Sequence, residues 1–236
     1  MRNKKFKNKK ILITGATGSV GTSVILELIK NYDFKVIRAM SNDENGLFLL
    51  KSKINKNSLS YEDLTKRQKI RLIHGDIRSR ERCLEATKDI DIVIHAAAMK
   101  HVDICEYNPQ EAIATNVTGT ENIVNASIKN NINKFILVST DKAARPNTIM
   151  GTSKLMAEKI VLNANNSASD VKKSFSVIRF GNVIGSRGSV FEVFNTQLRQ
   201  KIDLTITHKD MTRFFMSLED AAKKILKSIE ITRGGE

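Results

Sequence analysis

The chain has 236 residues, 41% of them hydrophobic, so it is long enough to bury a core. It contains no run of about 18 uncharged apolar residues, the length needed to span a membrane. The basic N-terminus MRNKKFKNKK runs into an apolar segment without a signal-peptide pattern, so we expect a cytoplasmic protein with free thiols at Cys83 and Cys105 and no metal site. The net charge of +14 comes without a basic stripe interleaved with aromatic residues, so it predicts no nucleic-acid partner and suits an anionic nucleotide.

Runs rich in Ile and Val alternate along the chain with stretches of helical periodicity. Segments such as ILIT and KFILVS are apolar on both faces, as strands buried between two helical layers are. The repeated βαβ order predicts an α/β fold with a Rossmann-type doubly wound parallel sheet. We predict strands at 10–13, 35–40, 70–74, 90–95, 134–139 and 174–180, and helices at 20–31, 79–87, 109–130 and 148–165.

A different pattern begins after residue 180. The segment GNVIGSRGSVFEVFNTQ is followed by a polar stretch containing MTRF and then by the helix-like run SLEDAAKKILKSIEITRGGE. We therefore expect residues 1–184 to form the main sheet domain and residues 185–236 to begin a second, smaller and incomplete region.

The first predicted strand leads into a glycine-rich loop, TGATGSVG, that precedes a predicted helix. Glycine allows a tight turn and a close backbone approach, and the N-terminus of a helix presents unpaired N–H groups to a pyrophosphate. Because the loop joins a strand to a helix in the first βαβ unit, it predicts a dinucleotide site. The loop residues assigned to this site are Gly15, Thr17, Gly18, Ser19, Val20 and Gly21.

Further cofactor contacts are predicted where the next strands end. An acidic residue after the second strand would bind a ribose 2′-OH and a basic one a 2′-phosphate. This chain has Arg38 and then SNDE, so NAD and NADP both stay open. Asp76 is a candidate acceptor for an adenine amino group, with capping of the next helix as the alternative. The residues assigned to the cofactor here are Ser41, Asp76, Ile77, Ala96, Ala97 and Ala98.

Seven motifs follow one another from about residue 10 to the end: TGATGSVG, HAAAMKHVDICEYNP, TNVTGTENIV, STDKA, MGTSK, RFGNVIGSRGSV and MTRF. Together they resemble the extended short-chain dehydrogenase/reductase enzymes that act on nucleotide sugars, above all the UDP-N-acetylglucosamine 4,6-dehydratases of the CapD-like polysaccharide biosynthesis group. The resemblance implies an NAD or NADP cofactor, a UDP-sugar substrate, a homo-oligomer and a role in polysaccharide or glycan synthesis. It assigns residues 1–184 to cofactor binding and residues 185–236 to substrate binding.

The resemblance also implies a reaction. The sugar loses a hydride from C4, water is eliminated across C5 and C6, and the hydride returns to C6. By similarity Asp141 is the acid and Lys142 the C5 base, both at the carboxyl end of the fifth predicted strand. In MGTSK, Met150 stands where many related enzymes have a tyrosine. Since methionine cannot exchange a proton, Thr140 is our candidate for the O4 proton.

Six residues elsewhere complete the expected site. Lys154 lies one helical turn after Met150 on the same face, where it would hold the nicotinamide ribose and add positive charge to the catalytic group. Asn116 is assigned to the cofactor. The resemblance places Asn182 and Arg213 at the substrate diphosphate, and the substrate site also includes Lys100 and Ser189.

Two other functions stay open. A UDP-sugar 4-epimerase would return the hydride to C4 and would form no 4-keto-6-deoxy sugar. A catalytically inactive nucleotide-binding or scaffold protein would bind dinucleotide without turning over any UDP-sugar, a role that Met150 would permit. Several members of the resembled group differ from this chain in having Arg in place of Asn42, and members generally continue into a further substrate-capping region.

Overall fold

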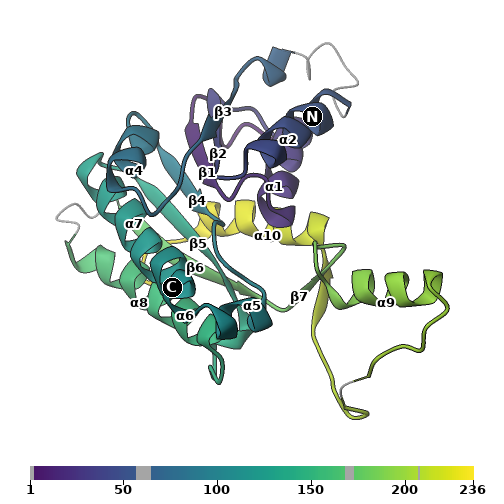
Figure 1. The fold of residues 1–236 in the computed structure, drawn as a ribbon. Coiled ribbons are helices and arrows are strands. Elements are labelled where there is room, and N and C mark those ends of the chain that lie inside the picture. The colour runs from purple at the N-terminus through teal and green to yellow at the C-terminus, as the bar shows by residue number, and fades with distance from the viewer. Residues whose placement is uncertain (1–2, 57–64, 168–172, 207) are drawn as a thin grey trace.

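The computed structural model describes residues 3–56, 65–167, 173–206 and 208–236. Its centre is a six-stranded parallel sheet with the strand order β3-β2-β1-β4-β5-β6 (Figure 1). Because the order reverses between β1 and β4, this is a Rossmann-type doubly wound sheet, and the predicted fold class is confirmed. The strands are β1 (Lys10–Thr14), β2 (Val36–Ser41), β3 (Ile70–His74), β4 (Ile92–His95), β5 (Lys134–Thr140) and β6 (Ser174–Phe180).

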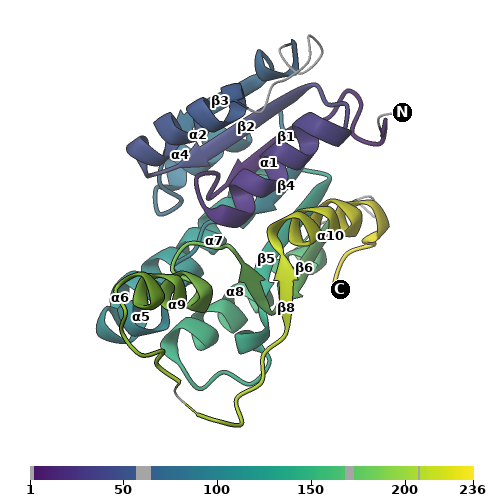
Figure 2. The ribbon, with the colours of Figure 1, turned by 90° about the vertical axis from the view of Figure 1, so that its right-hand side faces the viewer.

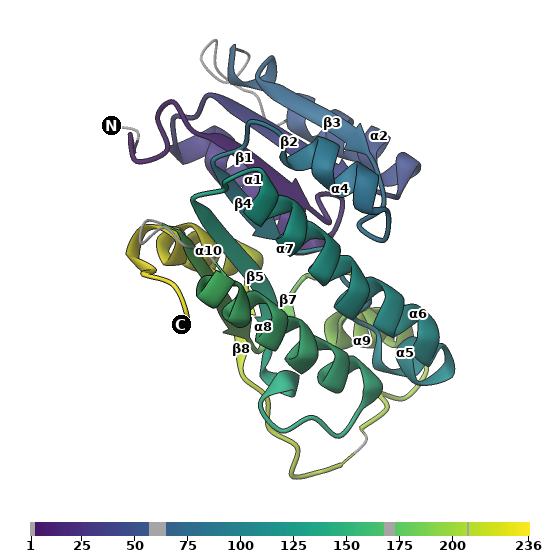
Figure 3. The same cartoon turned by 90° about the vertical axis from the view of Figure 1, so that its left-hand side faces the viewer.

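Helices cover both faces of the sheet, because successive side chains of a strand point to opposite sides. In β1, Ile11 and Ile13 belong to one buried core and Leu12 to the other. The first core lies under α1 (Ser19–Asn31), α2 (Glu44–Lys56) and α10 (Leu218–Ile231), and α1 and α10 face the viewer in Figure 2. The second lies under α4 (Arg80–Thr87), α7 (Gly119–Lys129) and α8 (Ile149–Ser167), which face the viewer in Figure 3.

The helix predicted at 109–130 is present and contains one irregular turn. It runs without a break through α6 (Pro109–Ala112), a π-helical segment η1 (Ile113–Thr118) and α7. A π-helical turn widens the helix locally and often occurs at functional sites. Among the helices whose bounds lie within the described residues, α2, α5 (Val102–Tyr107) and α9 (Val190–Arg199) were not predicted. At the start of α2 the carboxylate of Asp43 accepts a hydrogen bond from Gly46 N at 2.8 Å, a cap that periodicity alone does not reveal.

The segment after β6 leaves the main sheet and then returns to it. β7 (Asn182–Ile184) pairs in parallel with β8 (Phe215–Ser217), and α9 between them has no buried residue and lies away from the main sheet in Figure 1. In contrast, α10 packs against α1 and buries Ile225 and Leu226 in the first core. The predicted boundary at residue 184 stays a prediction, but the last helix beyond it shares the core of the sheet domain.

Three findings concern the side chains and helices of the described residues. Cys83 and Cys105 are free and buried. Within the described ranges, no His, Cys, Asp and Glu side chains form a group of three or more that could hold a metal ion. No helix in these ranges combines the length and apolar character needed to cross a bilayer.

Candidate active site

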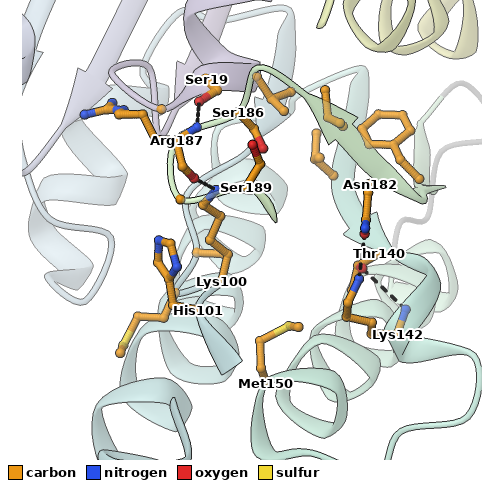
Figure 4. A pocket seen from close by; sticks show the side chains of 18 of the residues that line it. Ser19, Lys100, His101, Thr140, Lys142, Met150, Asn182, Ser186, Arg187 and Ser189 are labelled. Carbon is orange, nitrogen blue, oxygen red and sulfur yellow. Dashed lines mark hydrogen bonds between the residues drawn. The ribbon is translucent and has the colours of Figure 1, made fainter. Parts of the chain in front are cut away.

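Two adjoining cavities open along the carboxyl edge of the parallel strands, where sheets of this kind bind ligands. The larger has a volume of about 810 Å³ and extends from the glycine loop to the first residues of α9. The smaller, about 390 Å³, lies at the ends of β2 and β3. Figure 4 shows the larger cavity with Ser19, Lys100 and Arg187 on one wall and Lys142 and Asn182 on the other.

The glycine loop lines both cavities through Gly15 and Gly18. Gly15 has φ +65°, and a Cβ there would lie 2.6 Å from Ala97 N. A Cβ at Gly21 would lie 2.4 Å from Gly15 O, so only glycine fits at either position. Five of the six predicted loop residues line the larger cavity: Gly15, Gly18, Ser19, Val20 and Gly21.

The smaller cavity collects the residues predicted after β2 and β3. The hydroxyls of Thr17 and Ser41 lie 2.8 Å apart and join the glycine loop to the end of β2. Asp76 accepts hydrogen bonds from Arg78 Nε at 2.9 Å and Nη2 at 2.7 Å. Burial raises the pKa of Asp76, but the hydrogen bonds from Arg78 outweigh it and leave the pKa below its ordinary value. Ser41, Asp76, Ile77 and Ala97 all line this cavity.

The cap of α4 is not Asp76, so the alternative role considered for this residue is wrong. Ser79 is the N-cap, and its hydroxyl oxygen accepts a hydrogen bond from Arg82 N at 3.2 Å. The carboxylate of Asp76 lies at the cavity instead.

The STDKA motif ends β5 at the wall of the larger cavity. Thr140 caps the short 3₁₀ turn η2 (Asp141–Ala143): its hydroxyl oxygen accepts from Lys142 N at 3.3 Å, and the hydroxyl donates to Asp141 Oδ1 at 3.0 Å. Lys142 Nζ donates to Asp141 Oδ1 at 3.1 Å and to Asn182 Oδ1 at 3.2 Å. Three predicted catalytic residues and one predicted substrate residue thus form a single hydrogen-bond network.

Lys154 and Met150 reach the same cavity from α8. Lys154 Nζ donates to Val138 O at 2.8 Å, and burial lowers the pKa of Lys154 to about 8 although the carboxylate of Glu158 acts in the opposite direction. Met150 is buried beside Cys105 and presents a thioether to the cavity. The position that a tyrosine would occupy therefore offers no exchangeable proton.

Asn116 lies beneath the cavities, buried within η1. Its Oδ1 accepts from Met99 N at 2.8 Å, and its Nδ2 donates to Met99 O and to Ser153 Oγ, each at 3.0 Å. These hydrogen bonds tie the segment after β4 to α8. Asn116 lines neither cavity, whereas Ala96 and Ala98, on the segment that it holds, line both.

The predicted substrate residues are only partly brought together. Lys100 and Ser189 line the larger cavity with Asn182. Burial, with the nearby charge of Arg187, lowers the pKa of Lys100. Ser189 is the N-cap of α9, and its buried hydroxyl has no hydrogen-bond partner among the described residues. Arg213 is exposed, donates to Thr212 O at 2.7 Å and lines neither cavity, so its substrate role stays a prediction.

Two parts of the site were not predicted from the sequence. Arg187 lines both cavities, and its backbone N–H donates to Ser19 Oγ at 3.0 Å. Glu158 accepts hydrogen bonds from Arg179 and from Ser139 next to the catalytic network. Arg187, Arg179 and Ser139 lie inside motifs that were identified, but the partners are distant along the chain, so local spacing carries no signal of these contacts.

Comparisons with known proteins agree with the motifs. Residues 11–236 match the family described as polysaccharide biosynthesis protein. The UDP-N-acetylglucosamine 4,6-dehydratase (inverting) of Campylobacter jejuni subsp. jejuni serotype O:23/36 is 44% identical over 232 residues, 98% of this chain and 66% of that protein. The UDP-glucose 4-epimerase of Rickettsia bellii is 41% identical over 234 residues, 98% of this chain and 65% of that protein. The chain thus spans about two thirds of the length of these relatives.

Solved structures share the fold. Pen from Bacillus thuringiensis is 37% identical and superposes with a TM-score of 0.88 over 98% of this chain and 68% of that chain. A double mutant of DesIV, a dTDP-glucose 4,6-dehydratase from Streptomyces venezuelae solved with NAD bound, gives a TM-score of 0.79 over 95% of this chain and 72% of that chain; at 17% identity this likeness concerns the fold alone. The match over nearly the whole chain confirms the resemblance read from the motifs: this chain belongs to the polysaccharide biosynthesis protein family.

Proposed function

We propose that the chain is an NAD- or NADP-dependent 4,6-dehydratase that converts UDP-N-acetylglucosamine to a 4-keto-6-deoxy sugar nucleotide for polysaccharide or glycan synthesis. One observation carries this proposal. The amine of Lys142 lies between Asp141 Oδ1 and Asn182 Oδ1 at the wall of a cavity that the buried Lys154 also lines. A candidate base, a candidate acid and a second cation are thereby held at one cleft.

The residues of the glycine loop fit a dinucleotide. Gly15 and Gly21 line the larger cavity and have no room for a Cβ, and α1 begins directly after Gly18 with no acidic residue in its first turn. Such a helix N-terminus favours a diphosphate. Ser41 and Asp76 would hold the adenosine end in the smaller cavity, and Lys154 would hold the nicotinamide ribose in the larger. A bound nicotinamide supplies a hydride acceptor for C4 and a donor for C6.

The hydrogen bonds around Asp141 provide proton paths. Asp141 Oδ1 lies 3.0 Å from the Thr140 hydroxyl and 3.1 Å from Lys142 Nζ. As C4 is oxidised, the proton of the sugar O4 can pass through Thr140 to Asp141, which then holds the proton that the departing C6 hydroxyl takes as it leaves as water. Lys142, in its neutral form, takes the proton from C5. Met150 packs beneath the site without taking part.

A 4-epimerase is the second candidate function. It is favoured by the name of the Rickettsia bellii relative, whose identity to this chain is 41%. An epimerase needs proton exchange at O4 alone, which Thr140 could serve, and has no use for a base at C5 or an acid at C6. The pairing of Lys142 with Asp141 and Asn182 therefore favours the dehydratase.

The product distinguishes these functions. The chain is incubated with UDP-N-acetylglucosamine and with NAD or NADP, and the product is identified by NMR, with Lys142→Met as the inactive control. A 4-keto-6-deoxy sugar supports the dehydratase. A product with inverted C4 and an intact C6 hydroxyl would instead identify an epimerase. Dinucleotide binding without conversion of UDP-N-acetylglucosamine or UDP-glucose would identify the inactive binding protein.

A further inference from the structure

Lysines stand at the amino ends of the strands in the main sheet. β1 and β5 begin with Lys10 and Lys134, and a lysine immediately precedes β2, β3 and β6: Lys35, Lys69 and Lys173. The residue that directly follows a strand of this sheet is a lysine in no case; these residues are Gly15, Asn42, Gly75, Ala96, Asp141 and Gly181. Because the two ends of the strands differ so clearly, a general excess of lysine in the chain does not explain the pattern.

The parallel sheet gathers these lysines at one edge, which we call the amino edge. In the strand order β3-β2-β1-β4-β5-β6, Lys69, Lys35 and Lys10 lie on one side of β4, and Lys134 and Lys173 on the other. Neighbouring strands lie about 4.8 Å apart, so the row is roughly 25 Å long. Strands such as β1 and β5, with five and seven residues, put it roughly 20 Å from the carboxyl edge that holds both cavities.

The N-terminal segment brings a second group of lysines to the same edge. Phe6 is buried and packs on the ring of Tyr32, with the ring centroids 5.2 Å apart. The carbonyl oxygen of Lys9 accepts a hydrogen bond from Lys35 N at 2.9 Å. These contacts hold residues 3–9 beside the start of β2. The exposed lysines of this segment are Lys4, Lys5, Lys7 and Lys9.

The carboxylates at the amino edge are fewer than its lysines. Within three residues before any strand of the main sheet, the acidic residues are Asp33, Asp89 and Asp91. The Oδ2 atom of Asp91 accepts a hydrogen bond from Lys10 N at 2.7 Å, so this carboxylate is used within the chain. The amino edge therefore keeps an excess of positive charge.

We propose that the amino edge binds the surface of an anionic lipid bilayer. A lysine near such a surface raises the affinity by about fivefold, so several exposed lysines on one face are sufficient for peripheral binding. The cavities lie at the opposite edge of the sheet and stay open to solution when the amino edge faces lipid. This inference goes beyond the proposed function and does not depend on it.

Nucleic acid is the other polyanion that a basic face attracts. Proteins that bind single strands stack the bases on exposed aromatic rings. The aromatic side chains beside the start of β2, Phe6 and Phe34, are each only 3% exposed and offer no such platform. A broad row of lysines without exposed rings favours lipid headgroups.

The test measures sedimentation with vesicles. Wild type and two variants are mixed with vesicles of phosphatidylcholine, or of phosphatidylcholine and phosphatidylglycerol, over a range of salt concentrations. Both variants remove the same charge from exposed positions. The amino-edge variant combines Lys4→Gln, Lys7→Gln, Lys9→Gln and Lys35→Gln, and the control variant combines Lys51→Gln, Lys159→Gln, Lys201→Gln and Lys224→Gln.

We expect wild type to bind the vesicles with phosphatidylglycerol and not those of phosphatidylcholine alone. Binding should weaken as salt is added, because salt screens charges beyond about 8 Å at physiological ionic strength. The amino-edge variant should bind on the order of a hundredfold more weakly, and the control variant should lose much less. Melting curves and NAD affinity, both expected to match wild type, check that the variants are folded.

Three outcomes would overturn the proposal. Wild type that does not distinguish the two kinds of vesicle would show that no anionic lipid is bound. An equal loss in both variants would assign the attraction to net charge rather than to the amino edge. Binding of a fluorescent DNA duplex that the amino-edge variant loses, without vesicle binding, would assign this edge to nucleic acid. Each of these leaves the proposed function intact, since conversion of UDP-N-acetylglucosamine is measured without vesicles or DNA.

Discussion

Glu158 and Arg179 form a bidentate ion pair beside the catalytic network, with Nε to Oε1 at 2.9 Å and Nη2 to Oε2 at 2.5 Å. The same Oε1 accepts a hydrogen bond from the hydroxyl of Ser139 at 2.5 Å. Ser139 immediately precedes Thr140, and Glu158 lies one helical turn after Lys154. The ion pair therefore links β5, β6 and α8 at the point where we place the chemistry.

Replacing Glu158 by Gln should lower stability and shift the pH dependence of turnover. The amide leaves the partly exposed Arg179 without its counter-charge, so we expect the free energy of unfolding to fall by about 1–3 kcal/mol. The carboxylate also raises the pKa of Lys154, so its loss should move that pKa below about 8 and carry a limb of the pH–rate profile with it. Denaturant unfolding and pH–rate measurements check both effects.

The control for this variant is Glu219→Gln, which removes the carboxylate of an exposed pair with Lys223 on α10. Solvent screens an exposed pair of this kind, so neither the stability nor the pH profile should change appreciably. An unmoved pH profile in a destabilised Glu158→Gln enzyme would mean that Glu158 supports the site by packing alone.

Replacing Lys154 by Met should stabilise the protein at pH 7 while abolishing its activity. Burial lowers the pKa of Lys154 from 10.5 to about 8, so the folded chain holds a charged lysine at a cost of about 3 kcal/mol. The lost hydrogen bond to Val138 O offsets about 1 kcal/mol of the gain. We therefore expect a net stabilisation of about 2 kcal/mol at pH 7, measured by denaturant unfolding.

The stability that Lys154→Met gains over the wild type should decrease as pH rises. Between pH 8 and 10.5, Lys154 is protonated in the unfolded chain and neutral in the folded chain. The free energy of unfolding of the wild type therefore rises relative to that of the variant as pH rises through this window. The advantage of Lys154→Met is complete below pH 8 and should be gone near pH 10.5. The exposed Lys159 on the same helix provides the control Lys159→Met, which should show no such trend. A Lys154→Met variant less stable than wild type at pH 7 would contradict the argument.

Replacing Gly18 by Leu should remove dinucleotide binding but leave the fold intact. Gly18 has φ −65° and ψ 162°, an extended conformation open to any residue, and it lines both cavities. The larger side chain would fill the space where the two cavities meet, so we expect affinity for NAD and NADP to fall by about a hundredfold or more. In contrast, Gly15→Ala should unfold at a lower temperature, because its Cβ would lie 2.6 Å from Ala97 N at φ +65°. Normal cofactor affinity in Gly18→Leu would show that the loop is not the binding site.

Isotope exchange should separate the base from the acid. Lys142→Met, in deuterated water with UDP-N-acetylglucosamine, should incorporate no deuterium at C5, since the base is missing. Asp141→Asn keeps the amine, so C5 should still exchange although elimination stops. Product formation should fall by about 10²–10⁴ in each variant. Mass spectrometry and NMR of the recovered sugar nucleotide give the result. Exchange that persists in Lys142→Met and vanishes in Asp141→Asn would reverse the two roles.

Local patterns were sufficient for the fold class and for most of the candidate cleft. The strand at 70–74 and the strand at 174–180 were predicted with the bounds that the structure has, because β-branched and aromatic residues gathered in a few consecutive positions indicate a strand. The glycine loop and STDKA were placed at the carboxyl edge because each follows a predicted strand directly. In a parallel sheet, the residues that follow each strand must meet at one edge, so sequence position alone brings them together.

Only the tertiary structure decided how distant segments meet. The helix predicted over 109–130 is present, but its π-helical turn, where Asn116 is hydrogen-bonded to Met99 and Ser153, was not predicted from local patterns. The packing of α10 on α1 and the crossing of Arg187 over Thr17 likewise join segments that no periodicity relates. By itself, the sequence determined the glycine loop and the STDKA motif as parts of the cleft, since periodicity and turn chemistry are local properties, whereas Arg187 was missed and the predicted Asn116 and Arg213 line neither cavity. The hydrogen-bond partners of the side chains at the cleft depend on contacts that exist only in the folded chain. The same is true of the pKa of Lys154, which burial lowers, and of the position of the charged Arg187 beside both cavities.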